Sequence, residues 1–434
     1  MYWEKDIETL SRDELEALQI KRLQDTITNA SRSAYYKQLF AEKNISEDTI
    51  QNVKDIQKIP FTTKEDLRAN FPYGFLSVSK RDVIRLHSSS GTTGNPTAIF
   101  HTKHDLNSWA NLVARSLYST GTRDSDVFQN IVGYGLFTGG LGFQYGGEAL
   151  GALTIPAGAG NSKRQIKIMQ DYGTTVIHAI PSYLIHLNDI FKEMGMDPKK
   201  DTRLRILVIG AEPHTEEHRK RIEKIFGVKA FNSYGLSEMN GPGVAFECTE
   251  QSGLHIWEDA FLVEIIDPET LEPVPDGEVG ELVLTTLDRQ AMPLLRYRTR
   301  DLTRIIPGTC ACGRTHRRIE RLKGRSDDMF IIKGCNVFPM QIEKVLMDMP
   351  EVGNNYLITL QTVNDIDEMV VEVEVQENWF GDDFSRLEYV RGKITQAIRD
   401  EVLAKPIVKL VQPGKIAKGE GKAVRVVDNR KNGI

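Results

Sequence analysis

The sequence predicts an α/β protein with a large N-terminal domain and a small C-terminal α+β domain. Three observations support this prediction. Strand-like apolar runs alternate with helical patterns as far as Gly235, short alternating strands with Pro, Gly and Asp turns follow Leu254, and the pattern changes again after Gly324. The chain of 434 residues also exceeds the roughly 300 residues at which single cores stop growing, so two or three domains are expected.

The alternation begins with a helix. Apolar residues recur at helical spacing over residues 13–40, after Ser11, which is a good N-cap. The elements that follow alternate between apolar strands and helices, which favours a largely parallel sheet. We expect strands at residues 82–89, 126–132, 152–157, 174–180, 203–210 and 228–235, and helices at residues 105–121, 164–171 and 215–227.

Two further segments complete the chain. Turn-separated short strands over residues 254–323 indicate an antiparallel β subdomain within the N-terminal domain. The last part of the chain alternates between helix and strand, so we place a domain boundary after residue 325 and expect an α+β domain over residues 326–434. Its predicted elements are a helix at 336–350, a strand at 369–377, a helix at 383–403 and a strand at 408–416.

Composition and charge exclude several classes of protein. The fractions of apolar residues (40%) and charged residues (26%) are typical of a soluble globular protein. Because 55 basic residues face 60 acidic ones, the net charge of −5 gives no reason to bind nucleic acid or an anionic membrane. The N-terminus lacks the apolar core of a signal peptide, and no apolar run approaches a membrane span. We therefore expect a cytoplasmic protein.

A loop rich in serine, threonine and glycine, residues 88–94, follows a predicted strand. Glycine lets the backbone approach an anion while hydroxyls and amides donate to it, so the composition indicates phosphate binding. The loop is not a Walker motif, because Asn95 stands where that motif has lysine. A plain surface loop is the alternative. The segment AGAGNSK from Ala157 lacks the third glycine and the acidic residue of a dinucleotide-binding fingerprint.

Seven stretches, in this order and spacing, resemble the adenylate-forming superfamily and, within it, the phenylacetate-coenzyme A ligase family. They are PFTTKEDLRANFPYGF from Pro60, SSGTTGNPT, GAEP, YGLSE, YRTRD, GRSDDMFIIKGCNVFP and GKAVRV, and they span nearly the whole chain. The resemblance implies an enzyme that activates an aromatic carboxylate with ATP to an acyl-adenylate, with release of pyrophosphate. Coenzyme A then displaces AMP, after the C-terminal domain has rotated. A homodimer is also implied.

The resemblance assigns roles to residues of the nucleotide site. It implies that Tyr234 packs adenine, that Glu238 binds Mg²⁺, which suits a carboxylate and phosphate oxygens, and that Asp301 accepts both ribose hydroxyls. Without that context Glu238 reads as a surface acid and Asp301 as an ion-pair partner of Arg298 or Arg300. The phosphate loop comprises Ser88, Ser89, Ser90, Gly91, Thr92, Thr93 and Gly94. Other implied nucleotide contacts are Gly210, Ala211, Glu212, Pro213, Asn232, Ser233, Gly235, Ser237 and Arg325.

The remaining implied roles concern the acid, coenzyme A and the mobile domain. Lys422 is the implied catalytic lysine, inserted during adenylation, although Lys415 and Lys418 lie near it. Asp327 is the implied hinge and Gly334 lines the coenzyme A channel. The implied acid pocket comprises Tyr134, Gly135, Phe137, Gly140 and Ala211, and its aromatic residues have core packing as the alternative. Phe143 and Tyr145 are further aromatic candidates for this pocket.

Three of the four cysteines fall into two short motifs. Cys248 and His255 form a C-x6-H pair, and Cys310 and Cys312 form a C-x-C pair in a glycine-containing turn. Thiolates and an imidazole suit tetrahedral Zn²⁺, so we expect a structural zinc site. Buried free thiols are the alternative, and His316 is a competing ligand.

Two other functions stay open at this point. The same adenylating chemistry would also serve a different aromatic acid, or an acceptor other than coenzyme A, such as a carrier protein or an amine. A zinc-bearing binding module without catalysis is a different class of protein. It would require missing motif residues, and none of the central ones is absent.

Overall fold

Nine strands build the main sheet of the structure, a computed structural model that describes residues 2–88, 96–136, 138–332, 335–363, 366–376, 379, 384–416 and 424–430. The chain divides into two compact units. The first unit comprises Met1–Ala179, Lys200–Ala211 and Phe231–Leu322, and the second comprises Ile180–Lys199, Glu212–Ala230 and Lys323–Ile434. The domain boundary expected after residue 325 stays a prediction.

The main sheet of the first unit has a parallel part and an antiparallel part. Its order from edge to edge is β13 (Ile305–Ile306), β14 (Arg318–Ile319), β9 (Leu254–Ile256), β8 (Gly241–Glu247), β7 (Lys229–Leu236), β6 (Ile206–Gly210), β5 (Val176–Ala179), β3 (Val127–Asn130) and β4 (Leu153–Ile155). The pairs β3–β4, β3–β5 and β5–β6 are parallel, as the alternation of strands and helices predicts. The strands from β7 to β9, and from β9 through β14 to β13, pair antiparallel.

Two smaller antiparallel arrangements accompany this sheet. β1 (Arg85–Ser88) pairs with β2 (Ala98–His101), so a strand follows the serine, threonine and glycine loop. β10 (Phe261–Ile266), β11 (Gly280–Thr286) and β12 (Tyr297–Thr303) pair in sequence, which agrees with the antiparallel β subdomain expected from the turn-rich sequence. Both of these antiparallel arrangements belong to the first unit, together with the main sheet.

The helix predicted over residues 13–40 is wrong, because the structure has two helices there. α2 (Arg12–Ala30) begins at Ser11, which forms a capping box with Glu14, and α3 (Ala34–Lys43) begins at Ser33, whose side chain accepts from Tyr36 N. Serine favours a cap over a helix interior, so Ser33 starts a new helix where apolar spacing alone suggested continuation. The other helices of this unit are α1 (Lys5–Glu8), α4 (Lys64–Ala69), α5 (Lys103–Ser119), α6 (Thr138–Leu150) and α7 (Ser162–Tyr172).

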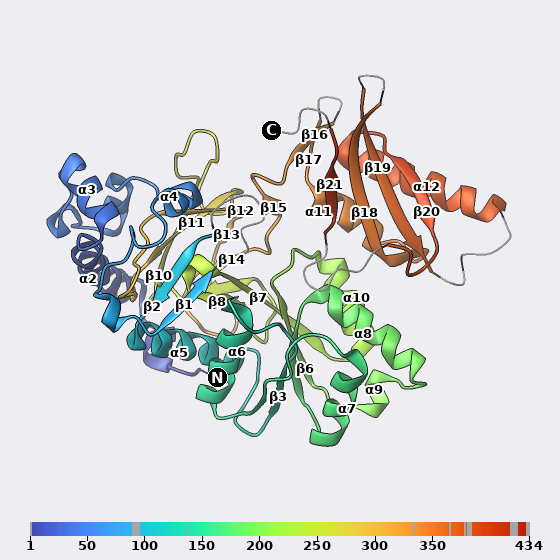
Figure 1. Ribbon diagram of the computed structural model, residues 1–434, viewed down its shortest axis with the longest axis horizontal. Helices are drawn as coiled ribbons and strands as arrows, with labels where there is room; N and C mark the ends of the chain where they lie inside the picture. The colour runs from blue at the N-terminus through green and yellow to red at the C-terminus, as the bar shows by residue number, and fades with distance from the viewer. Residues whose placement is uncertain are drawn as a thin grey trace. The chain divides into compact units, whose positions relative to one another are not determined.

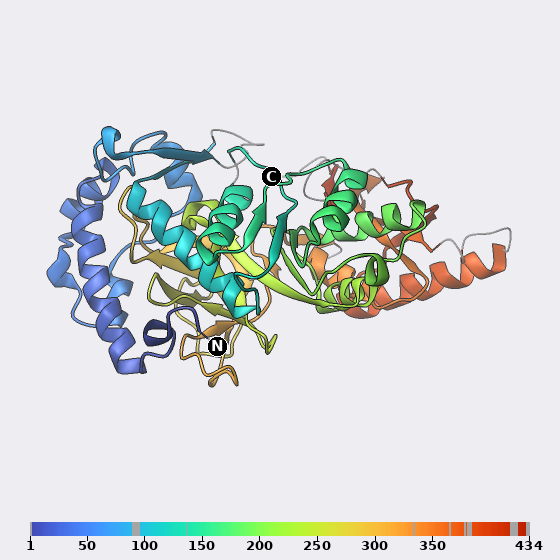
Figure 2. The same cartoon turned by 90° about the horizontal axis from the view of Figure 1, so that it is seen from below.

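The glycine-rich segment after β3 forms helix α6, which packs against α5 (Figures 1 and 2). A Cβ atom at Gly142 would lie 2.4 Å from the Trp109 ring, and one at Gly146 would lie 2.3 Å from Val113. These glycines therefore allow two helices to approach more closely than any side chain would permit. Glycine costs helix propensity, which is why the sequence did not predict this helix.

The second unit contains an α+β domain around a four-stranded sheet, drawn in orange and red in Figure 1. The strand order is β20 (Ile407–Val411), β19 (Ile366–Val375), β18 (Val352–Val363) and β21 (Val426–Asp428), with α11 (Pro339–Met347) and α12 (Phe384–Val402). The sequence did not predict β18. Apolar residues of these elements form a core of their own. The unit also contains α8 (Pro181–Glu193), α9 (Pro198–Asp201), α10 (Glu216–Phe226), β15 (Gly324–Arg325), β16 (Phe330–Ile332) and β17 (Cys335–Val337).

Candidate functional site

Tyr234 and Asp301 meet from two strands of the first unit. Tyr234 lies on β7 and Asp301 on β12, and the phenol donates to Asp301 Oδ2 at 2.7 Å. Both side chains are buried. Arg298 and Arg300, the alternative ion-pair partners considered for Asp301, have nitrogen atoms 2.8 and 3.6 Å from Glu281 Oε2. The pair therefore combines an aromatic ring with a carboxylate that can accept hydroxyl groups, which suits a nucleoside.

Glu238 lies on a single 3-10 turn, η4 (Ser237–Met239), directly after β7. The residue is only 5% exposed, so it is not a solvated surface acid. Its Oε1 atom is buried without a hydrogen-bond partner among the described residues, and Lys64 Nζ lies 3.7 Å from it. A buried carboxylate oxygen without donors is costly, and a hard divalent cation bound to it offsets that cost. The carboxylate therefore fits Mg²⁺.

Close backbone packing holds the turn around Glu238 in place. A Cβ atom at Gly235 would lie 2.0 Å from the Gly241 carbonyl oxygen. Asn240 has a φ of 80° and Gly241 one of 110°, so the chain reverses through left-handed conformations. Ser237 Oγ lies 3.2 Å from Thr138 Oγ, a hydrogen bond from the turn to the first residue of α6. These contacts leave the carboxylate little freedom to move.

The predicted nucleotide residues at the ends of β6 and β7 support one another. A Cβ atom at Gly210 would lie 2.2 Å from Ser233 Oγ, so glycine is required there. Ser233 Oγ donates to the Ile209 carbonyl at 3.0 Å, and Ala211 has a left-handed φ of 65°. Asn232, which precedes Ser233 in the chain, is also buried, and its backbone N–H donates to the Glu247 carboxylate. The strand ends thus form one rigid support.

Three other predicted contacts belong to the second unit. Glu212 accepts hydrogen bonds from Ser182 N at 3.0 Å and from Ser182 Oγ at 2.8 Å, in the first turn of α8. Pro213 follows it directly. Arg325 Nε and Nη2 donate to the two carboxylate oxygens of Asp327 at 2.8 and 2.9 Å. The implied nucleotide contact Arg325 and the implied hinge residue Asp327 therefore bind each other.

The segment predicted to form the acid pocket is anchored at both ends by Asn130, the last residue of β3. The Asn130 amide donates to the Tyr134 phenol at 3.0 Å and to the Gly140 carbonyl at 2.7 Å. The Tyr134 phenol donates to Gln144 at 3.0 Å, and His178 Nδ1 lies 2.8 Å from Asn130 Oδ1. Because the Asn130 amide uses both of its hydrogens, His178 Nδ1 carries the proton of this last bond.

The other aromatic candidates for the acid pocket have partners of their own. Phe143 is buried and stacks on His178, with 3.5 Å between ring centroids. The Arg85 guanidinium lies 4.7 Å from the ring centre of Tyr145 and donates to its hydroxyl. Gly135 has a φ of 117°, which glycine adopts without strain. Phe143 is therefore a core residue, the alternative considered for the aromatic residues of this segment.

Ser88, the first residue of the phosphate loop, is described, and its N–H donates to the Leu136 carbonyl at 3.1 Å. The same carbonyl lies 3.0 Å from His87 Nδ1, so the base of the loop is tied to the acid segment. The remaining predicted residues lie outside the described residues. They are Ser89, Ser90, Gly91, Thr92, Thr93, Gly94, Phe137, Gly334 and Lys422.

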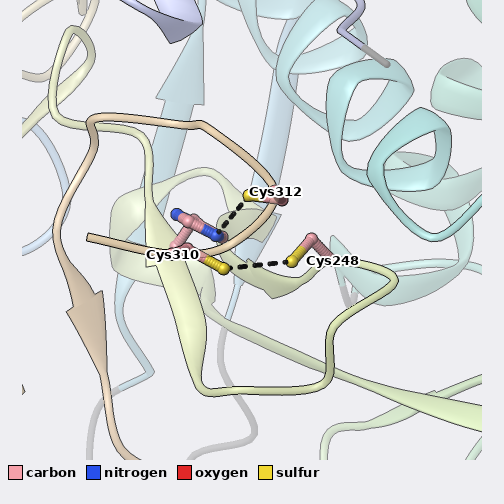
Figure 3. Close-up of side chains that lie close together, drawn as sticks. Cys248, Cys310 and Cys312 are labelled. Atoms are coloured by element: carbon pink, nitrogen blue, oxygen red, sulfur yellow. Dashed lines mark hydrogen bonds between the residues drawn. The ribbon is translucent and has the colours of Figure 1, made fainter.

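Three cysteines and one histidine form a compact cluster in the first unit. The possible ligand atoms of Cys248, His255, Cys310 and Cys312 all lie within 4.8 Å of one another, and Figure 3 shows the three thiols turned toward a common centre. The Cys248 and Cys310 sulfurs are 3.7 Å apart, and Cys312 Sγ lies 3.4 Å from His255 Nε2. Tetrahedral zinc, with Zn–S of about 2.3 Å and Zn–N of about 2.0 Å, gives S–S and S–N separations of about 3.8 and 3.5 Å. The donor set therefore fits zinc.

The surroundings decide between the two candidate histidine ligands. His255 Nδ1 lies 3.0 Å from the His316 carbonyl oxygen, so Nδ1 carries the proton and the Nε2 lone pair is left for a metal. His316 uses both ring nitrogens elsewhere. Its Nδ1 accepts from Glu258 N at 3.1 Å and its Nε2 lies 3.0 Å from the Ile7 carbonyl. His316 is therefore a supporting residue and not the competing ligand.

The cluster joins segments that are distant in sequence. Cys248 follows β8, His255 lies on β9, and the two other cysteines lie between β13 and β14. The N-terminal residues also reach this loop, because Tyr2 Oη donates to the Cys312 carbonyl at 3.0 Å. A hydrogen bond from Cys248 and the adjacent His255 imidazole lower the pKa of the Cys312 thiol, which favours the thiolate that binds metals.

Sequence reasoning missed four buried or charged residues around these sites: Lys64, Asn130, His178 and Arg289, whose side chain donates to the Glu238 carbonyl. Lys64 lies within the stretch from Pro60 that carries the family resemblance, so a signal for it was present. Asn130 lies near the carboxyl end of the strand predicted over residues 126–132, where ligand-binding residues gather. His178 and Arg289 carry no local signal, since only tertiary contacts give them a role.

Comparison with known proteins adds independent findings. The family model described as AMP-binding enzyme matches residues 17–287, and the model described as AMP-binding enzyme C-terminal domain matches residues 334–430. The phenylacetate-coenzyme A ligase of Thermus thermophilus is 44% identical, over 99% of this chain and 100% of its own length. The ligases of the same name from Pseudomonas putida and Escherichia coli are 44% and 42% identical over 98% of this chain, covering 96% and 97% of their own lengths.

Solved structures give a second comparison. The chain resembles 2-hydroxyisobutyryl-CoA ligase in the postadenylation state, with a TM-score of 0.93 and 28% identity over 99% of this chain and 92% of that one. The same ligase with CoA in the thioesterification state gives a TM-score of 0.73 at 29% identity, over 99% of this chain and 93% of that one. Among the helices that the structure describes, none is long and apolar enough to cross a membrane.

Proposed function

The chain belongs to the AMP-binding enzyme family, among the phenylacetate-coenzyme A ligases, and we propose that it is an ATP-dependent aromatic acid–coenzyme A ligase. One observation carries the proposal: the buried Tyr234–Asp301 pair and the Glu238 carboxylate, whose Oε1 atom has no hydrogen-bond partner among the described residues, lie at the same end of β7. In the first half-reaction a carboxylate oxygen attacks the α-phosphorus of ATP and pyrophosphate leaves. In the second, the coenzyme A thiolate attacks the acyl carbonyl carbon and AMP leaves.

The residues of the first unit bind and orient ATP in this proposal. The Tyr234 ring packs against adenine, and Asp301 accepts hydrogen bonds from the ribose hydroxyls. Glu238 holds Mg²⁺, which neutralises charge on the pyrophosphate end when it is bound. The loop of residues 88–94 supplies hydroxyl and amide donors to the departing pyrophosphate. Fixed donors and a fixed carboxylate lower the barrier because they need no reorganisation during the reaction.

The second half of the proposal concerns the C-terminal domain. Lys422 would contact the acid carboxylate and the α-phosphate during adenylation, where charge shifts in the transition state. Asp327 would then act as the hinge and Gly334 would line the coenzyme A channel. Two states of 2-hydroxyisobutyryl-CoA ligase, named postadenylation and thioesterification, support such a rotation within the family. The proposed domains are residues 1–325 and 326–434.

We assign the acid substrate to the phenylacetate type. The support is the identity to three phenylacetate-coenzyme A ligases together with the segment from Tyr134 to Gly140 that Asn130 anchors. A phenylacetate-type acid combines an apolar ring with a carboxylate, and an aromatic slot bounded by glycine accommodates a flat ring. A different aromatic acid is the runner-up within the same chemistry.

The zinc cluster has a structural role in this proposal. Cys248, His255, Cys310 and Cys312 supply four ligands, so no coordination position is left open for a substrate. Zn²⁺ there would fasten the turn between β13 and β14 to β8 and β9. A cytoplasmic location and a homodimer stay predictions, which cell fractionation and the mass measured by light scattering would test.

The decisive experiment measures AMP and thioester together. Purified protein is given Mg·ATP, a panel of aromatic acids, and coenzyme A present or withheld. We expect AMP release that depends on coenzyme A, with phenylacetate among the best acids, and loss of activity in Glu238→Gln. Adenylate formed without any thioester would instead favour a carrier protein or an amine as acceptor. No pyrophosphate release with any acid would favour a zinc-bearing binding module.

A further inference from the structure

Arg289 is a buried arginine that none of these roles uses. It is 4% exposed and lies in the loop after β11. Its Nη1 donates to the Glu238 carbonyl and its Nη2 to the Phe100 carbonyl at 3.4 Å, while Nε is buried without a hydrogen-bond partner. It forms no ion pair with any residue that the structure describes. A buried guanidinium bound only to neutral carbonyls needs an explanation, because its desolvation is costly.

Residues of helix α5 form hydrogen bonds with the loop on both sides of this arginine. Asp288, on one side, accepts a hydrogen bond from Ser108 at 2.7 Å. On the other side, Asp105 accepts from Gln290 N at 2.7 Å and from Ala291 N at 3.0 Å. The backbone of the arginine is therefore fixed from both directions, and its side chain reaches the back of the turn that carries Glu238.

Two carboxylates, Asp105 and Glu238, lie near enough to Arg289 to interact with its charge. Burial lowers the pKa of Arg289 to about 10, against the opposing effect of Asp105 and Glu238, so the guanidinium stays charged at neutral pH. The Asp105 oxygens already accept from backbone amides, including Thr102 N at 2.8 Å. Glu238 Oε1 has no hydrogen-bond partner. Lys64 Nζ lies 3.7 Å from that oxygen, within ion-pair distance but too far for a hydrogen bond, so the Glu238 carboxylate is the nearby acidic group whose hydrogen-bonding capacity is still unfilled.

We propose that Arg289 is a positioning residue for the first half-reaction: it holds the backbone of the Glu238 turn and so fixes the carboxylate that would hold the Mg²⁺ ion of Mg·pyrophosphate. The inference rests on the proposed function, because that function assigns Mg²⁺ to Glu238. Arg289 acts through Glu238 and contacts no reacting atom in this account. Its charge also offsets part of the negative charge that the pyrophosphate end brings into a buried site.

Binding of Mg·pyrophosphate, measured by calorimetry, tests the inference without requiring turnover. We expect Arg289→Met to weaken binding about 10- to 100-fold, the loss that displacing one charge-assisted contact causes. Arg289→Lys should recover most of the affinity, because it keeps the charge near the turn. Thioester formation from preformed acyl-adenylate and coenzyme A should be unchanged in both variants. Arg164→Met, the same change at an exposed arginine of α7, is the matched control and should bind as the wild type does.

A double variant separates positioning from general stability. If Arg289 acts through the carboxylate, Arg289→Met should weaken Mg·pyrophosphate binding in the wild-type background and not further in Glu238→Gln. Wild-type affinity in Arg289→Met would overturn the inference, and so would equal losses in both backgrounds. If Arg289→Met does not fold, Arg289→Gln, which removes the charge and keeps a polar side chain, takes its place in the same comparison. A wild-type protein whose affinity for Mg·pyrophosphate depends on Arg289, but which forms no adenylate with any acid, would refute the proposed function and leave the positioning of Glu238 by Arg289 standing.

Discussion

Replacing Cys310 with serine should remove zinc and destabilise the first unit. Cys310 and Cys248 are 62 positions apart in sequence, and their sulfurs lie 3.7 Å apart. A cross-link that closes a loop of this length stabilises the folded state by about 4 kcal/mol in the chain-entropy model. A shift of roughly 2–4 °C per kcal/mol is typical of larger domains, so we expect the Tm to fall by about 8–16 °C.

Two measurements check this prediction. Elemental analysis of the purified wild type should find one zinc per chain, and Cys310→Ser should lose most of it, because a serine hydroxyl is a poor zinc ligand. Calorimetry should show the lower Tm in the variant and a similar shift when a chelator strips the wild type. Cys335→Ser is the matched control, since Cys335 is a partly buried free cysteine outside the cluster. Wild-type protein without zinc, or Cys310→Ser with unchanged Tm and zinc content, would refute the reasoning.

Three further predictions concern the active site and its support. Lys422→Ala should slow adenylation about 10²- to 10³-fold and leave thioester formation from preformed acyl-adenylate intact, whereas Lys415→Ala should resemble the wild type in both half-reactions. Asp301→Asn should raise the KM for ATP about 10- to 100-fold, since a bond to a charged group is lost, with a smaller effect in Tyr234→Phe; an unchanged KM would remove the ribose assignment. Burial lowers the pKa of His178 to about 3. Its neutral form is therefore favoured by folding, and stability should fall by about 1.4 kcal/mol per pH unit as pH drops from about 6.5 toward 3. Denaturant titrations at several pH values should find a shallower fall in His178→Gln than in the wild type or in the exposed-residue control His104→Gln.

The placement of the proposed nucleotide residues around the end of β7 was largely predictable because its signals are local. Tyr234, Gly235 and Glu238 belong to one short stretch, and a strand followed by a tight glycine turn places them at one strand end. The β subdomain was predictable for a similar reason, since turn residues mark each short strand. The helix break at Ser33 was less accessible, because capping competes with helix spacing over only a few residues.

The cluster of Cys248, His255, Cys310 and Cys312 shows what local sequence patterns cannot predict. The sequence supplied two pairs of soft ligands and left two histidines as candidates. Only the tertiary structure decided between them, because the His316 nitrogens are taken by Glu258 and Ile7, both distant in sequence. No spacing rule contains that information.

The sequence by itself determined the family, the order of its motifs and the donor atoms available for ATP, Mg²⁺ and zinc. These follow from residue types at short spacing, which local chemistry constrains strongly. The tertiary structure decided which of those atoms lack hydrogen bonds: Glu238 Oε1 accepts none from the part of the chain that the structure describes, while Arg298 pairs with Glu281 instead of Asp301. It also gave Arg289 a role behind the Glu238 turn. Burial and partner choice arise from contacts between distant segments, so they become visible only once the chain is folded.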